Sequence, residues 1–385
     1  MKKKLRVGHI GTKHDHSRDI ISCLAKFPDD FEIVGVVEED EKWRALVQPT
    51  EPYCHYPFLS EEQLLNAGCD FVVCEGFEYD LPFAALRCVE NGIPVHIDKP
   101  AGRDIDVFEK VLRTAKAKNL PVQLGYMYRY NPAVADCFEL VKSGALGEIH
   151  SVTALMSSDH APEKRQWLDR FGEGGIMFFL GCHMVDMVCM MCGEPEEVIP
   201  FNTASLNDGI DSKDLGFAVF KYPHGVSFVK SSASEVNGFE RRQVVVNGTK
   251  GSFHIQPIED RTGGPQVEEC SHVHISFVED GVEEPWGPAG KDVVFGPFGR
   301  YTEMMTDFAA VVRGEKKISF DYDYELMVQR TLLKACGCSI DLGEIHGTLC
   351  LEKPCQGRYA GRIHKAPQRA FLAGNDGNVQ RRRSP

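Results

Sequence analysis

The first 125 residues alternate short apolar runs with amphipathic helical patterns, and this alternation restricts the fold more than any other feature. The runs read LRVGHI, FEIVGVV, FVVC, PVHI and PVQL, and stretches such as DVFEKVLRTAKAKN separate them. Parallel strands need a crossover connection, usually a helix, so this repetition predicts a doubly wound parallel α/β sheet. One intervening helix is predicted at SEEQLLNAG, where Ser60 and Gln63 have the spacing of a capping box.

The second half of the chain has a different pattern. GEIHSVTALMSS, DLGFAVFKYPHGVSFVKSSASE and RRQVVVNGTKGSFHI are long strand-like runs with turns at YPHG and NGTKG, which is typical of an antiparallel sheet. Helical patterns return at YTEMMTDFAAVVRG and DYELMVQRTLLKACG, and we expect these helices to cover one face of that sheet. Residues 126–350 are therefore predicted to form an α+β domain with a largely antiparallel open sheet. The basic tail, 351–385, is expected to be disordered.

Charge and cysteine usage limit the class of partner. The formal net charge of −13 argues against nucleic acid or an anionic membrane, because both need a basic face, so a small-molecule partner is favoured. No run approaches the length of about eighteen apolar residues that a membrane span needs, and MKKK leads into LRVGHIG without the apolar region of a signal peptide. The scattered cysteines indicate free thiols and a cytoplasmic protein. CMMC, at 189–192, is expected to be a buried helix segment.

The segment GHIGTKHDHS follows the first apolar run and allows two interpretations. His14, Asp15 and His16 could ligate a metal, but the spacing is consecutive and no third partner or HxxxH pattern is nearby. The alternative is the phosphate-binding turn of a Rossmann fold, because a helical pattern, SRDIISCLAKF, begins directly after it.

The glycine pattern of such a turn survives only in part. In Gly-x-Gly-x-x-Gly only the first glycine, Gly11, remains, and Lys13 and His16 take the other two positions. The strand-turn-helix context nevertheless favours the nucleotide interpretation, with no bound metal. The predicted cofactor-binding residues of this turn are Gly11, Thr12, Lys13, His14 and His16.

An acidic residue ends the second apolar run. Glu38 lies twenty-seven residues after Gly11. An acidic side chain at this point of a Rossmann fold accepts hydrogen bonds from a ribose 2′-hydroxyl and repels a 2′-phosphate. The sequence therefore predicts NAD as the cofactor, with NADP less favoured.

Four motifs further along the chain resemble a known family. DKP at 98–100, GYMYRYNP at 125–132, GALGEIHSV at 144–152 and GGIMFFLGCHMVDMV at 174–188 occur in the order seen in the Gfo/Idh/MocA family. The family is that of glucose-fructose oxidoreductase and inositol dehydrogenase. The resemblance covers about residues 5–345. It implies an NAD-binding Rossmann domain at 1–125 and a substrate-binding and oligomerisation domain at 126–350.

The resemblance also implies roles for individual residues. The family usually has Glu-Lys-Pro where this chain has Asp98-Lys99-Pro100. In the family the lysine reaches the substrate hydroxyl beside the nicotinamide, and the peptide bond between the lysine and the proline is commonly cis. Lys99 is thus predicted to be catalytic and to contact cofactor and substrate, because an ammonium group can stabilise a developing alkoxide. His183 matches the family's catalytic histidine.

Other positions follow from the same motifs. Arg129 is predicted to contact the cofactor, and Tyr128, Asn131 and Asp186 are predicted to contact substrate together with His183.

Two departures from the family pattern affect the predicted site. The family has an aspartate four residues before its catalytic histidine, and here that position is Phe179. The loop after FVVC reads CEGFEYD in place of Thr-Pro followed by histidine, so Glu75 and Asp80 occupy it, and Glu75 is assigned to the cofactor site.

We therefore predict an NAD-dependent oxidoreductase that transfers a hydride between nicotinamide and a sugar, polyol or derivative. His183 would take the hydroxyl proton while Lys99 supports the alkoxide. One alternative is a lyase or glycosidase that uses NAD transiently with no net redox change, and another is a non-catalytic dinucleotide-binding protein. As in relatives, a homodimer or homotetramer is expected.

Overall fold

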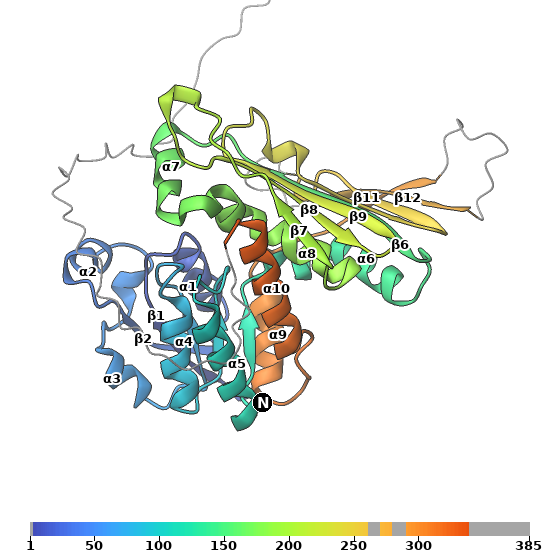
Figure 1. Ribbon diagram of the computed structural model, residues 1–385. Helices are drawn as coiled ribbons and strands as arrows, with labels where there is room; N and C mark the ends of the chain where they lie inside the picture. Colours follow the sequence, from blue (N-terminus) through green and yellow to red (C-terminus); the bar gives the residue numbers. More distant parts are fainter. Residues whose placement is uncertain (1–2, 261–269, 279–289, 339–385) are drawn as a thin grey trace, which may run out of the picture. The chain divides into compact units, whose positions relative to one another are not determined.

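The computed structural model describes residues 3–260, 270–278 and 290–338 (Figure 1), so the predicted tail at 351–385 lies outside the described residues. The described residues belong to one compact unit, Met1–Ile340. The predicted division at 125 falls between the last strand of the first sheet, which ends at Leu124, and a short 3-10 helix that begins at Met127.

The first sheet has five parallel strands in the order β2-β1-β3-β4-β5. This order reverses at β1 and β3, and ligands of doubly wound folds bind at the carboxyl ends of the strands at such a point. Strands β3, β4 and β5 are buried throughout, as expected for strands covered on both faces. The strands are β1 (Leu5–Ile10), β2 (Phe31–Val37), β3 (Phe71–Cys74), β4 (Val95–Ile97) and β5 (Val122–Leu124).

The helices of this region confirm the predicted alternation. They are α1 (Ser17–Ala25), α2 (Glu41–Val47), α3 (Glu61–Leu65), α4 (Leu81–Glu90) and α5 (Ile105–Lys118). The predicted capping box opens α3: Gln63 N–H donates to the Ser60 hydroxyl at 3.1 Å, and Ser60 N–H donates to Gln63 Oε1 at 2.9 Å. Helix α1 begins directly after the histidines of the first turn, as predicted.

The second sheet has eight strands in the order β13-β12-β11-β10-β6-β9-β8-β7. All neighbours are antiparallel except β6 and β9, so the largely antiparallel prediction is confirmed. The strands are β6 (Ile149–Ser157), β7 (Glu197–Pro200), β8 (Leu215–Tyr222), β9 (Gly225–Ser232), β10 (Gln243–Gly248), β11 (Gly251–Ile255), β12 (Ser271–Phe277) and β13 (Lys291–Phe295).

Buried helices pack against this sheet. Helix α8 (Cys182–Cys192) contacts β6 and β9, and ten of its eleven residues are buried. The CMMC segment is therefore part of a buried helix, as predicted, and both of its cysteines are free. The other elements here are α6 (Pro132–Lys142), α7 (Pro162–Trp167), a π-helical turn, η4 (Met177–Gly181), and the 3-10 helices η2 (Met127–Tyr130) and η3 (Leu168–Gly174).

The last two helices do not simply cover the antiparallel sheet, as the sequence pattern led us to expect. Helix α9 (Thr302–Val312) packs against α1 and η2, and α10 (Tyr322–Ala335) packs against α5 as well as α8 and β7. Figure 1 shows α10, near the red end of the colour bar, beside α5. The apolar faces of both helices pack at the junction between the two sheets. The periodicity of a sequence shows that a helix has an apolar face but does not show which surface that face covers.

Among the described residues, no single helix is long and apolar enough to cross a membrane. The pair Pro162–Gly174 and Met177–Cys192, bent by 80°, meets the length and composition criteria only when its two parts are taken together.

Candidate functional site

A cavity of about 360 Å³ opens at the carboxyl ends of β1, β2 and β3, where a doubly wound sheet binds its ligand. Three predicted cofactor residues line it, namely Gly11, Lys13 and Glu38. Gly76 and Asp80 face it from the loop after β3. Gly11 has a φ of +85°, and a Cβ atom there would lie 2.3 Å from the Gly76 Cα, so only glycine fits where these two loops meet.

Glu38 is buried at the end of β2 and holds the first turn. Its Oε2 accepts hydrogen bonds from Thr12 N–H at 3.1 Å and from the Thr12 hydroxyl at 2.7 Å, and its Oε1 accepts from Asp40 N–H at 3.1 Å. A carboxylate has about four acceptor sites, so one remains for a ribose hydroxyl. The residues therefore fit the adenosine end of a dinucleotide.

The cavity is acidic. Its carboxylates are those of Glu38, Glu39, Asp40, Glu61 and Asp80. Its two cations are already paired, because Lys13 Nζ lies 2.9 Å from Asp40 and Arg87 forms an ion pair with Glu61. This excess of negative charge opposes an additional phosphate on the ribose.

The turn that follows β1 is folded onto itself. His14 N–H donates to the Glu75 carbonyl at 3.1 Å, and His16 N–H donates to His14 Nδ1 at 3.1 Å. With Thr12 N–H bonded to Glu38, three backbone donors of the predicted phosphate-binding turn already have partners. Thr12, His14 and His16 are not among the residues that line the cavity, and their cofactor contacts stay predictions.

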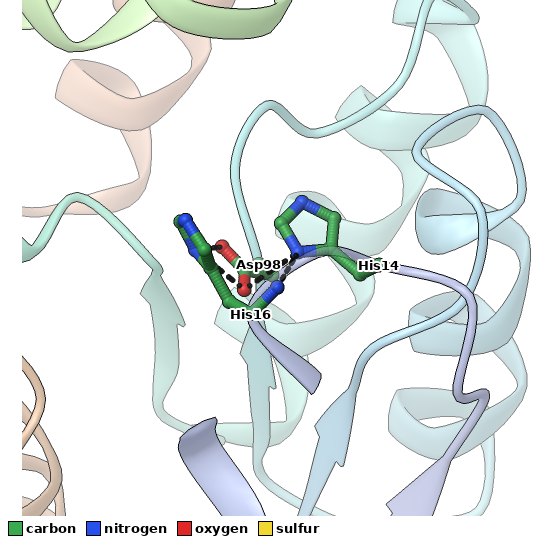
Figure 2. Close-up of side chains that lie close together, drawn as sticks. All are labelled: His14, His16 and Asp98. Atoms are coloured by element: carbon green, nitrogen blue, oxygen red, sulfur yellow. Dashed lines mark hydrogen bonds and ion pairs between the residues drawn. The ribbon is translucent and has the colours of Figure 1, made fainter. Parts of the chain in front are cut away.

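The two histidines of this turn converge on Asp98, which directly follows β4 (Figure 2). His14 Nδ1 lies 3.1 Å from Asp98 Oδ2, and His16 Nδ1 lies 3.2 Å and 3.1 Å from the two Asp98 oxygens. Asp15, the carboxylate between the histidines in sequence, instead forms an ion pair with Lys164 at 2.6 Å. The carboxylate that accompanies the two histidines is therefore that of Asp98 and not that of Asp15.

Opposing effects set the protonation of this cluster. Burial lowers the pKa of His16 to about 4, more than the Asp98 charge raises it. Burial also acts to lower the pKa of His14, but Asp98 and Glu78 outweigh it and raise that pKa. The pKa of Asp98 is held well below its usual range, because the two histidines outweigh burial.

Two further carboxylates are buried beside the cluster. Glu75 Oε2 lies 3.9 Å from His14 Nδ1, and Glu78 Oε1 lies 3.9 Å from His14 Nε2. None of the four oxygens of these two carboxylates has a partner of good hydrogen-bond geometry, but Glu75 interacts directly with Asp98. Burial, followed by the Asp98 charge, raises the pKa of Glu75 well above its usual value. Glu75 is assigned to the cofactor site by sequence, but its carboxylate faces the histidines and it does not line the cavity.

Lys99 and His183 lie close together in the interior. Lys99 is 1% exposed, and its Nζ donates to the Phe179 carbonyl at 3.1 Å. The Lys99–Pro100 peptide is cis, as the resemblance implied. The His183 ring stacks on that of His16 with centroids 6.5 Å apart, and its Nδ1 has no hydrogen-bond partner. Burial and then the Lys99 charge lower the pKa of His183 well below its usual value.

Phe179, at the position of the family's aspartate, belongs to an aromatic group. Its ring lies 5.7 Å from that of Phe171 and 5.1 Å from that of Trp167. Lys99 Nζ lies 5.0 Å from the ring centroid and Lys164 Nζ lies 4.7 Å from it. Two ammonium groups thus face an aromatic ring where the family resemblance implies a carboxylate.

Four residues predicted to contact ligand are occupied by contacts within the protein. Arg129 lies between Asp186 and Glu325, with its NH2 group 2.7 Å from Asp186 Oδ1 and its NH1 group 2.6 Å from Glu325 Oε1. Tyr128 donates to Glu259 at 2.7 Å. Asn131 caps α6 and donates to Ser271 at 2.9 Å. The contacts that the structure gives to Arg129, Asp186, Tyr128 and Asn131 are thus structural, and their ligand contacts stay predictions.

Sequence reasoning missed the acidic part of the site. Asp98 was read only as the first residue of the Asp-Lys-Pro motif, and Glu78 was not singled out. Asp98 lies more than eighty residues from both histidines in sequence, so their contact depends on the alignment of β1 and β4 within the sheet. The available signal was an acidic residue directly after a buried strand, since such positions meet at one edge of a parallel sheet.

Fold and site together define a two-domain protein with a nucleotide-type cavity and a buried histidine–lysine–carboxylate cluster. Residues 134–254 match the family model of the GFO/IDH/MocA C-terminal domain. The resemblance to the Gfo/Idh/MocA family is thereby confirmed over these residues, which are similar to that family's C-terminal domain.

The sequence relatives include proteins named as oxidoreductases and dehydrogenases, and solved structures share the fold. An uncharacterized oxidoreductase of Rhizobium meliloti is 22% identical over 251 residues, which are 64% of this chain and 71% of that protein. A D-xylose 1-dehydrogenase (NADP(+)) of Haloferax volcanii is 24% identical over 63% of this chain and 70% of its own length. The structure of levoglucosan dehydrogenase with NADH and levoglucosan has a TM-score of 0.70 at 15% identity, covering 87% of this chain and 98% of the other.

Proposed function

We propose that this chain is an NAD-dependent oxidoreductase that acts on a hydroxyl group of a sugar, a polyol or a derivative. Two observations together carry the proposal: a cavity at the carboxyl ends of β1, β2 and β3, and the buried residues Lys99 and His183, which lie outside the lining of that cavity but interact electrostatically with each other. Relatives named as dehydrogenases of D-xylose and of myo-inositol support the substrate class.

The charge of the cavity supports NAD over NADP. The named relatives include an NADP enzyme and a structural neighbour bound to NADH, so they do not decide between the two cofactors. Glu38 offers a free acceptor position to a ribose 2′-hydroxyl, whereas Glu39, Asp40 and Asp80 would repel a 2′-phosphate.

In the proposed reaction the bound nicotinamide exchanges a hydride with the carbinol carbon of the substrate. Lys99 places its ammonium group where negative charge develops on the substrate oxygen and stabilises it in a buried, water-poor environment. His183 Nδ1, which has no partner, accepts the hydroxyl proton. Arg129 acts as a positioning residue, because its ion pair with Asp186 fixes the helix that carries His183.

A panel of sugars, polyols and their acidic derivatives, incubated with NAD, tests the proposal. Both NADH absorbance and product are measured. We expect at least one member to give NADH and oxidised product in equal amounts. Product without NADH would instead support a lyase or glycosidase with transient redox chemistry, and NAD binding without product from any member would support a non-catalytic protein.

A further inference from the structure

We infer that His14, His16 and Asp98 form a binding site for one divalent transition-metal ion of the zinc type. Each residue offers one ligand atom, and these atoms all lie within 4.8 Å of one another. Two imidazoles and one carboxylate, with no thiolate, suit zinc or iron(II), and three protein ligands leave a coordination position open. The inference concerns binding by the chain itself and does not rest on the proposed hydride transfer.

The spacing of the ligand atoms matches such an ion. Bonds of about 2.0–2.1 Å in a tetrahedral arrangement place neighbouring ligand atoms roughly 3.3 Å apart. His14 Nδ1 lies 3.1 Å from Asp98 Oδ2, and His16 Nδ1 lies 3.1 Å from the same oxygen. Both distances to Asp98 are thus within a few tenths of an ångström (~0.2 Å) of those in such a site, and the two histidine ligand atoms lie within 4.8 Å of each other.

The hydrogen bonds of His14 determine which of its nitrogens is free to bind a metal. Its Nε2 lies 3.0 Å from the Lys99 carbonyl oxygen, which can only accept, so Nε2 carries the proton. Its Nδ1 accepts the His16 N–H, so a metal ion bound to Nδ1 would take the place of that hydrogen bond. The same nitrogen lies 3.1 Å from Asp98 Oδ2. Two acceptors face each other there unless a proton or a cation lies between them. A backbone carbonyl that orients a ring through its other nitrogen is typical of metal-bound histidines.

The surrounding charge also favours a cation. Asp98, Glu75 and Glu78 are buried together around His14, with Glu75 and Glu78 each 3.9 Å from one of its ring nitrogens. Lys99 is the nearby buried ammonium group, and its Nζ is directed to the Phe179 carbonyl. A buried carboxylate is costly in its charged form, and a bound divalent ion would offset that cost for the carboxylates gathered here. The side chain of His16, which is 15% exposed, provides a side from which the ion can enter.

Among the described residues, two other groups of potential ligands provide an internal comparison. Glu51, Cys54 and His55 are exposed, and Asp260, Cys270 and His272 are only half-buried or exposed. In each group the histidine already pairs with the carboxylate at 2.9 Å, and these exposed or half-buried side chains need no ion. Both groups must be removed in a binding experiment, because they could hold zinc weakly.

The experiment uses the full-length chain with His55→Ala and His272→Ala, stripped of metal with a chelator. Zinc chloride is titrated by calorimetry, and cobalt(II) is added in parallel to record its d–d absorption bands. We expect one zinc ion per chain and a cobalt spectrum of low coordination number. Adding His16→Ala, or separately Asp98→Asn, should weaken zinc binding by more than the roughly 100-fold that changes outside the ligands cause.

Thermal melts of each stripped variant establish that it is folded, and Asp98→Asn preserves side-chain size if His16→Ala disturbs the start of α1. The inference would be overturned if neither His16→Ala nor Asp98→Asn lowered the zinc affinity. It would also be overturned if the parent protein bound zinc no more tightly than the His16→Ala protein does. NAD titrations on the same samples separate the two proposals: zinc binding without NAD binding contradicts only the proposed function, and the reverse contradicts only the metal site.

Discussion

The cavity at β1 to β3 and the buried cluster around Asp98 share the turn at 11–17 but differ in how their polar groups are satisfied. In the cavity, Glu38 accepts three hydrogen bonds, and Lys13 and Arg87 are paired with carboxylates. In the cluster, Glu75, Glu78 and His183 have buried atoms without a partner of good hydrogen-bond geometry. Because unsatisfied buried groups are rare outside functional sites, the comparison separates a region suited to binding from a region suited to chemistry.

The largest expected effect comes from His183→Ala. Turnover should fall about 10²- to 10⁴-fold, because the proposed proton acceptor is lost, while NAD affinity changes by no more than about twofold. Steady-state kinetics on an identified substrate and calorimetric NAD titration check both parts. His224→Ala, in the exposed turn between β8 and β9, is the matched control. Near-full turnover of the His183 variant would place the base elsewhere, with Lys99 or a tyrosine of GYMYRY next.

Arg129→Met should have the largest effect on stability. It leaves Asp186 and Glu325 buried without their cation, which costs about 3–5 kcal/mol in the free energy of unfolding. Urea unfolding measures the loss, and Arg241→Met, which breaks an exposed pair with Glu235, should cost less than about 1 kcal/mol. Equal losses in the two variants would contradict the assigned role of the buried pair.

The same variant has an expected pH dependence. Burial, which outweighs Arg129, already raises the pKa of Glu325, and removing the arginine raises it further. A carboxyl with a raised pKa in the folded state binds its proton more tightly there than in the unfolded state, so stability increases as the pH falls through the folded-state pKa. The stability deficit of Arg129→Met relative to the unsubstituted protein should therefore shrink between about pH 8 and about pH 5. A constant deficit across this range would mean that Glu325 does not take up the proton.

Glu38→Ser tests the binding region and should have a smaller effect. We expect NAD affinity to fall about tenfold, because one charge-assisted hydrogen bond to the ribose is lost, and the preference over NADP to narrow. Adding Glu39→Arg should narrow it further. Glu39→Ser alone changes the cavity charge equally but removes none of the Glu38 hydrogen bonds, so it is the control. Equal affinities for NAD and NADP in the unsubstituted protein would contradict the role of Glu38.

The smallest expected effect is a gain. Phe179→Asp restores the family's carboxylate within reach of two ammonium groups, Lys99 and Lys164, and should raise turnover by less than about tenfold by stabilising protonated His183. Phe179→Asn introduces a side chain of the same shape as aspartate but without its charge, and it should give no gain in turnover. Because both variants disrupt the aromatic group around Phe171, their thermal melts must be compared first. A gain in the Asn variant alone would exclude the electrostatic explanation.

Much of the fold could be predicted from the sequence, because it is encoded locally. The apolar runs, the capping box at Ser60 and the turn at Gly11 each depend on a few neighbouring residues. The positions of α9 and α10 were not predictable in this way, since an apolar helix face does not specify which surface it covers. Asp98 replaced Asp15 in the histidine cluster for a similar reason, because only the alignment of β1 with β4 brings distant residues together.

The central claim, hydride transfer between substrate and bound NAD, is tested most directly with a substrate deuterated at its reacting carbinol carbon. After turnover, mass spectrometry of the nicotinamide pool shows where the deuterium has gone. The account predicts one deuterium in the reduced cofactor for each molecule of oxidised product, together with a slower rate than with the protiated substrate. Oxidised product formed without deuterium in the reduced cofactor would contradict it.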